Sequence, residues 1–176
     1  MLSGSYENFD RFWGRKDGKR VNWCGTLPSS PAPYAAKPST GFYLHPSLFP
    51  SPKTPFSSSL APPVLLLGPF QGRPACLEIA LSSPSSRALG VCASAFLSRK
   101  TVVVPDVENH AGHIACDGVT RSEVVVPILV KGKDGVEVCV GVLDVDCEAP
   151  DAFGEEDRAG LEKVVQALNQ LIAWGV

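Results

Sequence analysis

Glu123-Val-Val-Val-Pro-Ile-Leu-Val130 is the stretch of sequence that decides the fold, together with the turn and the apolar run that follow it. The turn is Lys131-Gly-Lys-Asp-Gly135, and the second run covers residues 136–145. β-Branched residues dominate both runs, as is typical of strands. Aspartate followed by glycine suits a hairpin turn. The sequence therefore predicts two core strands that pair in antiparallel fashion.

Around this hairpin, further elements can be assigned from apolar periodicity. Three more strands are predicted at residues 64–67, 75–81 and 101–104. Helices are predicted at residues 90–98 and at about 155–174, where apolar residues recur with the 3.6-residue period. Gly154 is an adequate N-cap for the second helix. These elements predict an α+β fold, with a central antiparallel sheet and flanking helices.

Proline and serine are concentrated in three segments that we interpret as loop insertions, at about residues 26–40, 45–62 and 82–88. Proline removes a backbone donor and restricts the chain, so such segments sustain neither a helix nor a central strand. The first two flank a short aromatic island, Gly41-Phe-Tyr-Leu44. We expect all three insertions to lie on the surface as loops.

Composition limits the possible functions. The chain has 176 residues, 44% of them hydrophobic, and a net charge of -2, which predicts one domain with a core and gives no basic field for nucleic acid. We find neither an apolar run of membrane-span length nor the basic and apolar regions of a signal peptide at residues 1–10. A cytoplasmic, reducing location is therefore expected. There the six cysteines indicate inert thiols, a metal site or redox chemistry.

The long polar segment between two predicted strands, residues 104–118, carries the candidate chemistry. It contains His110, His113 and Cys116, and Glu123 opens the next strand. On the partner strand, Asp144 and Asp146 are two residues apart, so their side chains project from the same face. Paired carboxylates at the end of an apolar strand are costly unless they bind something. They suit an ammonium group or a shared proton.

Each of these residues also has a purely structural interpretation. The spacing His110-x2-His113-x2-Cys116 resembles part of a zinc site, but the sequence offers no clear fourth ligand, so no metal is expected. Cys139 lies in an apolar strand and is expected to be a small core residue, whereas Cys147 fits either role. Any cysteine taken singly is best explained as an inert buried thiol.

Several motifs together resemble the GAF-domain free methionine-R-sulfoxide reductases. They are Val21-Asn-Trp23, Gly41-Phe-Tyr43, Leu67-Gly-Pro-Phe-Gln-Gly-Arg-Pro-Ala-Cys76, Gly90-Val-Cys92, Val104-Pro-Asp-Val107, Ala111-Gly-His-Ile-Ala-Cys-Asp117, Ser122-Glu-Val-Val-Val-Pro127, Gly141-Val-Leu-Asp-Val-Asp146 and Phe153-x-Glu-Glu-Asp157. The resemblance extends from about residue 21 onward, outside the insertions. It implies a GAF-like fold and an oxidoreductase that converts free methionine-(R)-S-oxide to methionine.

The resemblance also implies roles for three cysteines. Cys116 would attack the sulfoxide sulfur, release methionine and become a sulfenic acid. Cys76 or Cys92 would then condense with it to form an intramolecular disulfide, and the sequence leaves both open. An external thioredoxin-like protein would restore the thiols, so no bound cofactor is expected.

The remaining site residues follow from the same resemblance. Among Glu123, Asp144 and Asp146, one would protonate the departing oxygen and the others would hold the substrate amino group. Aromatic side chains would wall the S-methyl end of the site, and backbone amides near residues 114–116 would receive the sulfoxide oxygen or the carboxylate. The substrate-binding candidates added in this way are Trp23, Tyr43 and Ile114.

The chain differs from the family pattern at its N-terminus. The helix that normally precedes the Asn-Trp motif is reduced to residues 1–20, which we treat as a truncated segment before one catalytic domain at residues 21–176. Two alternatives to the enzyme stay open: a GAF sensor that binds a small ligand without turnover, and an inactive relative. A homodimer is compatible with the sequence, whereas nucleic-acid and membrane partners are not expected.

Overall fold

An antiparallel sheet of six strands forms the centre of the computed structural model, which describes residues 39–49, 63–73, 75–82, 89–110, 114, 116 and 118–175. The strands are β1 (Ser39–Leu44), β2 (Val64–Gln71), β3 (Glu78–Ala80), β4 (Val102–Val104), β5 (Ser122–Lys131) and β6 (Glu137–Cys147), and their order across the sheet is β3-β2-β1-β6-β5-β4. All neighbouring strands pair in antiparallel fashion. The predicted α+β architecture is confirmed.

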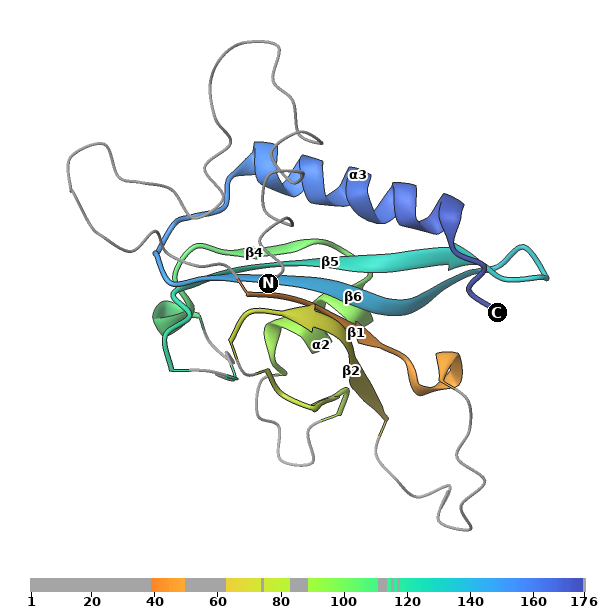
Figure 1. Ribbon diagram of the computed structural model, residues 1–176, viewed down its shortest axis with the longest axis horizontal. Coiled ribbons are helices and arrows are strands. Elements are labelled where there is room, and N and C mark those ends of the chain that lie inside the picture. The colour runs from red at the N-terminus through yellow and green to blue at the C-terminus, as the bar shows by residue number, and fades with distance from the viewer. Residues whose placement is uncertain are drawn as a thin grey trace, which may run out of the picture.

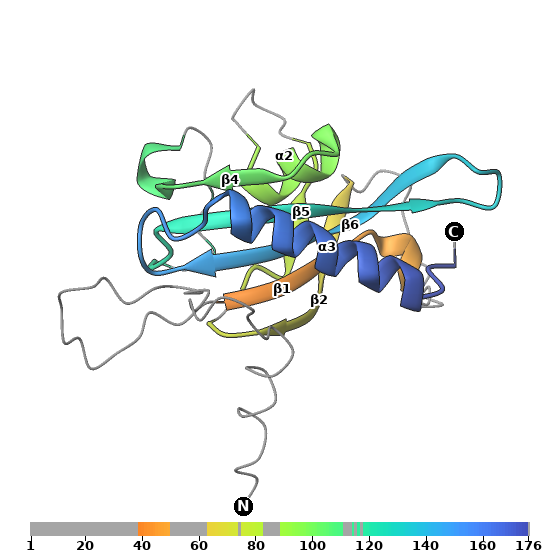
Figure 2. The same cartoon turned by 90° about the horizontal axis from the view of Figure 1, so that it is seen from above.

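Helices cover both faces of this sheet. The helix α3 (Glu155–Leu171) lies along one face and α2 (Val91–Ser98) lies on the other (Figure 1). Seen from above, α3 crosses the middle strands of the sheet (Figure 2). Two short 3-10 helices, Pro46–Leu48 and Val107–Asn109, complete the described elements. No helix in the described part of the chain combines the length and the apolar character needed to cross a membrane.

The hairpin of β5 and β6 forms the core of the sheet, as predicted from the sequence. It joins Ser122 to Cys147 at one end and Lys131 to Glu137 at the other, with a register shift between Ile128 and Leu129. Pairing of β5 with β4 stops at Val125. Pro127 therefore lies beyond the last β4 pair, and its ring nitrogen interrupts no ladder between these two strands.

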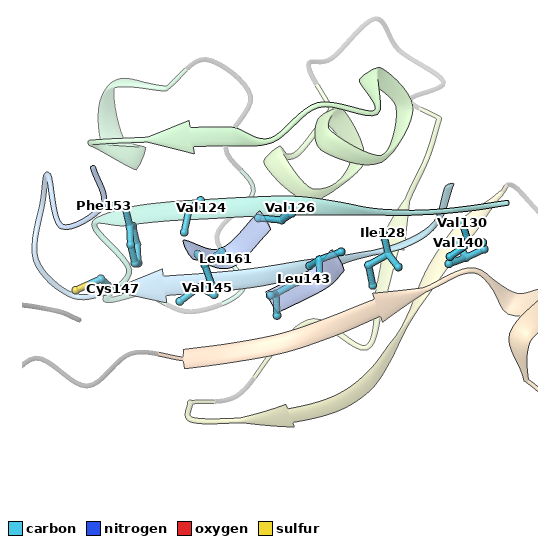
Figure 3. Packing of buried hydrophobic residues seen from close by; sticks show 11 residues of the cluster. Val124, Val126, Ile128, Val130, Val140, Leu143, Val145, Cys147, Phe153 and Leu161 are labelled. Atoms are coloured by element: carbon cyan, nitrogen blue, oxygen red, sulfur yellow. The ribbon is translucent and has the colours of Figure 1, made fainter. Parts of the chain in front are cut away.

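The face of the hairpin toward α3 is apolar. Figure 3 shows Val124, Val126 and Ile128 from β5 beside Leu143 and Val145 from β6. Leu161 and Val165 of α3 pack against them at the 3.6-residue spacing. Full burial of each such side chain stabilises the fold by roughly 1.5–3 kcal/mol. A slip of one residue would turn these side chains to the opposite face, away from α3, so packing against α3 fixes the register.

The opposite face carries a second apolar cluster and the polar residues of interest. Val125 and Val142 pack there with Tyr43 of β1 and with Ala93 and Ala95 of α2. Because side chains alternate along a strand, the residues two positions from Val125 and Val142 share this face. These residues are Glu123 and Asp144, so the fold places both carboxyls beside α2.

Some element boundaries differ from the prediction. The aromatic island is strand β1, which also takes in Ser39 and Thr40 from the predicted insertion at residues 26–40. Residues 46–48 of the second insertion form a 3-10 helix. The strand expected at residues 75–81 is limited to Glu78–Ala80, because it is these three residues that pair with β2.

The last helix is shorter than predicted at its C-terminal end. It stops at Leu171, where the Ile172 backbone becomes extended, with φ -106 and ψ 127. Asn169 donates a hydrogen bond to the Leu129 carbonyl oxygen and so ties the final turn to β5. At the other end, the Gly154 backbone donates to the Asp157 carboxylate, which confirms the predicted N-cap. The segment at residues 1–20 and most of the three insertions lie outside the described residues.

Candidate functional site

A cavity of about 240 Å³ opens on the α2 face of the sheet, at the end where β5 begins and β6 ends. This volume is below the range of typical drug-sized pockets and suits a ligand the size of an amino acid. Strands β1, β5 and β6, the start of α2 and the segments around two cysteines contribute to its walls. The lining includes Tyr43, Cys76, Cys92, Ile114, Cys116, Glu123, Asp144 and Asp146.

The three carboxyls at the bottom of the cavity come from the β5–β6 hairpin. Glu123 pairs directly with Asp146, and Asp144 pairs with Val125 two pairs further along the ladder. Facing residues in an antiparallel pair have Cβ atoms roughly 4.5–5.5 Å apart. Glu123 is 5% exposed and Asp144 is 9% exposed, whereas Asp146 is half-buried. The predicted shared face of Asp144 and Asp146 is thus observed, with Glu123 beside them.

Burial of these groups favours their protonated forms. The pKa of Glu123 is raised to about 8, chiefly by desolvation and then by the charge of Asp146. The pKa of Asp144 is raised well above its ordinary range, by burial and then by Glu123. Oδ1 of Asp144 is buried and has no hydrogen-bond partner among the described residues. Near neutral pH, Glu123 is therefore a protonated acid in the cavity, and Oδ1 of Asp144 is an acceptor without a donor among the described residues.

Cys92 lies in the first turn of α2, next to the carboxyls. Its side chain is 6% exposed, and Sγ donates to Oε1 of Glu123 over 3.8 Å. Burial, followed by the nearby Asp144 and Glu123 carboxyls, raises the pKa of the thiol well above its ordinary value. A thiol in such surroundings is a poor nucleophile, because the thiolate is the reactive form.

Cys76 and Cys116 form a disulfide at the mouth of the cavity, with their Cα atoms 5.1 Å apart. Cys116 is exposed and Cys76 is half-buried. The sequence left Cys76 and Cys92 open as partners of Cys116. The structure joins Cys116 to Cys76, and among the described cysteines it leaves Cys92 and Cys139 free. A sulfur bond that is both exposed and adjacent to a cavity is accessible to an external reductant.

The other predicted site residues fall into two groups. Tyr43 is 2% exposed and lines the cavity, and burial, more than the nearby acids, raises the pKa of its phenol. Ile114 is exposed at the rim, close to Gly90 at the start of α2. Trp23 and His113 lie outside the described residues.

Four polar residues of the cavity were not predicted, namely Ser39, Arg73, Glu78 and Thr120. Arg73 lines it and forms an ion pair with Glu148, with Nη2 and Oε1 2.6 Å apart. Ser39 lines it from β1, and its Oγ accepts a hydrogen bond from the Arg73 backbone nitrogen. Arg73 stands three residues before Cys76 in the motif that ends at this cysteine, so the motif could have indicated Arg73 as a site residue. Ser39 has no such signal, because only the pairing of β1 with β6 brings it to the site.

Within the described part of the chain, one group of three side chains has the geometry to hold a metal ion. Cys92, Glu123 and Asp144 each offer one ligand atom, and these atoms lie within 4.8 Å of one another. All three residues are buried. This group differs from the His110, His113 and Cys116 set that the sequence suggested.

Comparison with known proteins places this chain in a family. The GAF domain family matches residues 59–172, which is more than half of the chain. The free methionine-R-sulfoxide reductase of Saccharomyces cerevisiae is 43% identical over 106 residues, covering 60% of this chain and 53% of that protein. The reductase of the same name from Escherichia coli is 39% identical over 109 residues, covering 62% of this chain and 59% of that protein.

A solved structure agrees with these relatives. The free methionine-R-sulfoxide reductase of Neisseria meningitidis, in complex with its substrate, is 37% identical and superimposes with a TM-score of 0.57. The match covers 75% of this chain and 65% of that one. The chain spans between about half and three fifths of the length of the two relatives named above. It therefore belongs to the GAF-domain family and is similar, within that family, to free methionine-R-sulfoxide reductases.

Proposed function

We propose that this protein reduces free methionine-(R)-S-oxide to methionine, with a cysteine pair as the source of electrons. The observation that carries the proposal is the Cys76–Cys116 disulfide at the mouth of an amino-acid-sized cavity with three carboxyls at its floor. The similarity to reductases of this name supplies the substrate.

The reaction begins at Cys116 in the reduced protein. Its sulfur attacks the sulfoxide sulfur while the sulfoxide oxygen takes up a proton. The oxygen then passes to Cys116, so that methionine leaves and the cysteine becomes a sulfenic acid. The Cys76 thiol attacks this sulfenic sulfur, expels water and forms the disulfide. Two electrons have then moved from the cysteine pair to the substrate.

Glu123 is the residue best suited to donate the proton. It is buried at the floor of the cavity, and its raised pKa keeps it protonated at neutral pH. A general acid works best when its pKa lies near the operating pH. Cys92 donates a hydrogen bond to the Glu123 carboxyl, so it supports the acid in place and is not required to form the disulfide.

Asp144 and Asp146 would hold the substrate ammonium group. Both line the cavity, and the buried Oδ1 of Asp144 needs a hydrogen-bond donor, which an ammonium group provides. Tyr43 forms an aromatic wall, and such faces attract groups that carry partial positive charge, including a sulfoxide S-methyl. Ile114 and its backbone lie at the entrance, where the substrate carboxylate would emerge.

A second substrate must return the protein to its reduced state. The exposed position of Cys116 suits attack by a dithiol protein of the thioredoxin type, which would leave the two thiols free and take the disulfide itself. No bound cofactor takes part in this cycle. The cycle requires a reducing compartment, which in most cells is the cytoplasm.

The test is turnover of each free methionine sulfoxide epimer by the purified protein with an excess of dithiol, followed by measurement of methionine. We expect the R epimer to be consumed and the S epimer to be spared. Cys116→Ser removes the attacking sulfur and should abolish turnover, whereas Cys139→Ser, which changes a cysteine outside the cavity, should retain it. Binding of the sulfoxide without turnover by the parent protein would favour a ligand-binding GAF module instead.

A further inference from the structure

We propose that Cys92, Glu123 and Asp144 form a binding site for a thiophilic divalent cation, Zn²⁺ in the cell, and that an ion bound there blocks the cavity. The three residues come from three elements, α2, β5 and β6, which fold together at the cavity floor. Neither the sequence motifs nor the proposed reaction calls for a cation at this position.

The geometry of the ligand atoms fits such an ion. A sulfur and two carboxylate oxygens lie within 4.8 Å of one another. Zinc binds cysteine sulfur at about 2.3 Å and carboxylate oxygen at about 2.0–2.2 Å, so its tetrahedral ligands lie roughly 3.5 Å apart. Small side-chain rotations bridge this difference. One soft and two hard donors are a combination that zinc accepts, whereas magnesium and calcium prefer oxygen alone.

A second observation points to a missing ligand. Asp144 is 9% exposed, and its Oδ1 is buried with no hydrogen-bond partner among the described residues. An unsatisfied buried acceptor costs free energy. Asp144 is also one of the three residues that offer a ligand atom, so an ion bound by its carboxyl would place a positive charge beside the unsatisfied oxygen.

The site is separate from the redox pair. Cys76 and Cys116 are bonded to each other, and Cys92 is a free thiol in the same structure. The cation site therefore persists when the disulfide is formed. Binding requires Cys92 and the carboxyls to release their protons to solvent, as metal ligands of these types do. The cavity provides the open fourth position, for water or for Asp146.

A bound ion would occupy the two carboxyls that the proposed reaction assigns to substrate and acid. Zn²⁺ would then inhibit the reductase in competition with the sulfoxide. This inhibition rests on the proposed function, whereas ion binding does not. The experiment therefore measures ion binding first and inhibition of turnover second.

The test uses the full chain with its Cys76–Cys116 disulfide intact, so that the redox pair supplies no thiol. After removal of metal with a chelator, the protein is titrated with Cd²⁺ and the ultraviolet charge-transfer band of a cadmium thiolate is recorded. We expect a band that saturates at one equivalent in the parent and in Cys139→Ser. In Cys92→Ser the band should be lost. In Asp144→Asn the Cd²⁺ concentration needed to saturate the band should rise by about tenfold or more. Zn²⁺ should displace the Cd²⁺.

A band that is equal in Cys92→Ser and in the parent, or one that disappears in Cys139→Ser, would overturn the proposal. Asp144→Asn keeps the thiol and gives an independent reading if Cys92→Ser fails to fold. A protein that shows the band but reduces neither epimer would retain the cation site and reject the proposed reaction. A protein that reduces the R epimer but shows no band would retain the proposed reaction and reject the cation site.

Discussion

Replacement of Glu123 by glutamine should remove a pH-dependent cost from the folded protein. The carboxyl is 5% exposed, and its pKa rises from an ordinary 4.5 to about 8 in the folded state. In the unfolded state the group ionises near pH 4.5. The folded state therefore binds one more proton than the unfolded state between these two pH values, and stability falls as pH rises through this window.

The magnitude follows from the same two pKa values. Each pH unit well inside the window costs about 1.4 kcal/mol, and the slope falls near pH 8 because the folded group titrates there. Between pH 6 and pH 8 this group therefore removes about 2 kcal/mol of stability. Glutamine has nearly the same shape and does not ionise. Between pH 6 and pH 8, the free energy of unfolding of Glu123→Gln should therefore fall by about 2 kcal/mol less than that of the parent. At low pH, where Glu123 is protonated in both states, the variant has no advantage in stability.

The assay is urea unfolding of both proteins at several pH values, with the disulfide intact and a chelator present. The free energies of unfolding are compared as a difference between variant and parent, which cancels the other titrating groups. A matched control is Glu156→Gln, because Glu156 is exposed in the first turn of α3. If the difference for Glu123→Gln stayed flat between pH 6 and pH 8, Glu123 would be ionised in the folded protein and the proposed acid would be lost.

Further predictions concern activity and packing. Turnover of the R epimer should fall as pH rises above about 8, since Glu123 then loses its proton, and pH profiles of kcat with constant dithiol would measure this. Cys76→Ser should release one methionine and then stall, whereas Cys92→Ser should still form the disulfide, as peptide mapping would report. Gly141→Ala should destabilise the fold by about 1–3 kcal/mol, because its Cβ would meet a β1 carbonyl oxygen at 2.5 Å. Gly160→Ala in α3, where nothing lies within 4 Å of the added Cβ, should instead stabilise it by about 1 kcal/mol in the same urea assay.

The central hairpin could be predicted from sequence because its two runs and its turn agree with one another. Val124, Val125 and Val126 are identical in the sequence, however, so only the assembled fold shows that Val124 and Val126 face α3 and Val125 faces α2. Strand β1 was harder, because Pro/Ser-rich residues surround it and its six residues carry little periodic signal. It is defined by its two neighbours, β2 and β6, which lie far from it in the sequence.

The part of the site that lies on one strand could also be predicted from the sequence. Asp144 and Asp146 share a strand, so their common face follows from period two. The choice between Cys76 and Cys92 could not be made, because it depends on how α2 packs. Packing buries Cys92 against Glu123 and leaves Cys76 at the mouth of the cavity beside Cys116. Burial of Glu123, which sets its pKa, is likewise a property of the assembled core.

A single-turnover experiment tests the central claim most directly. The fully reduced protein is mixed with one equivalent of free methionine-(R)-S-oxide and no external reductant, and both products are measured. The proposed reaction predicts one methionine per protein and an equal amount of the Cys76–Cys116 disulfide. Methionine formed without this disulfide would contradict the assigned cysteine pair, and a sulfoxide left unchanged beside an active control enzyme would contradict the reaction itself.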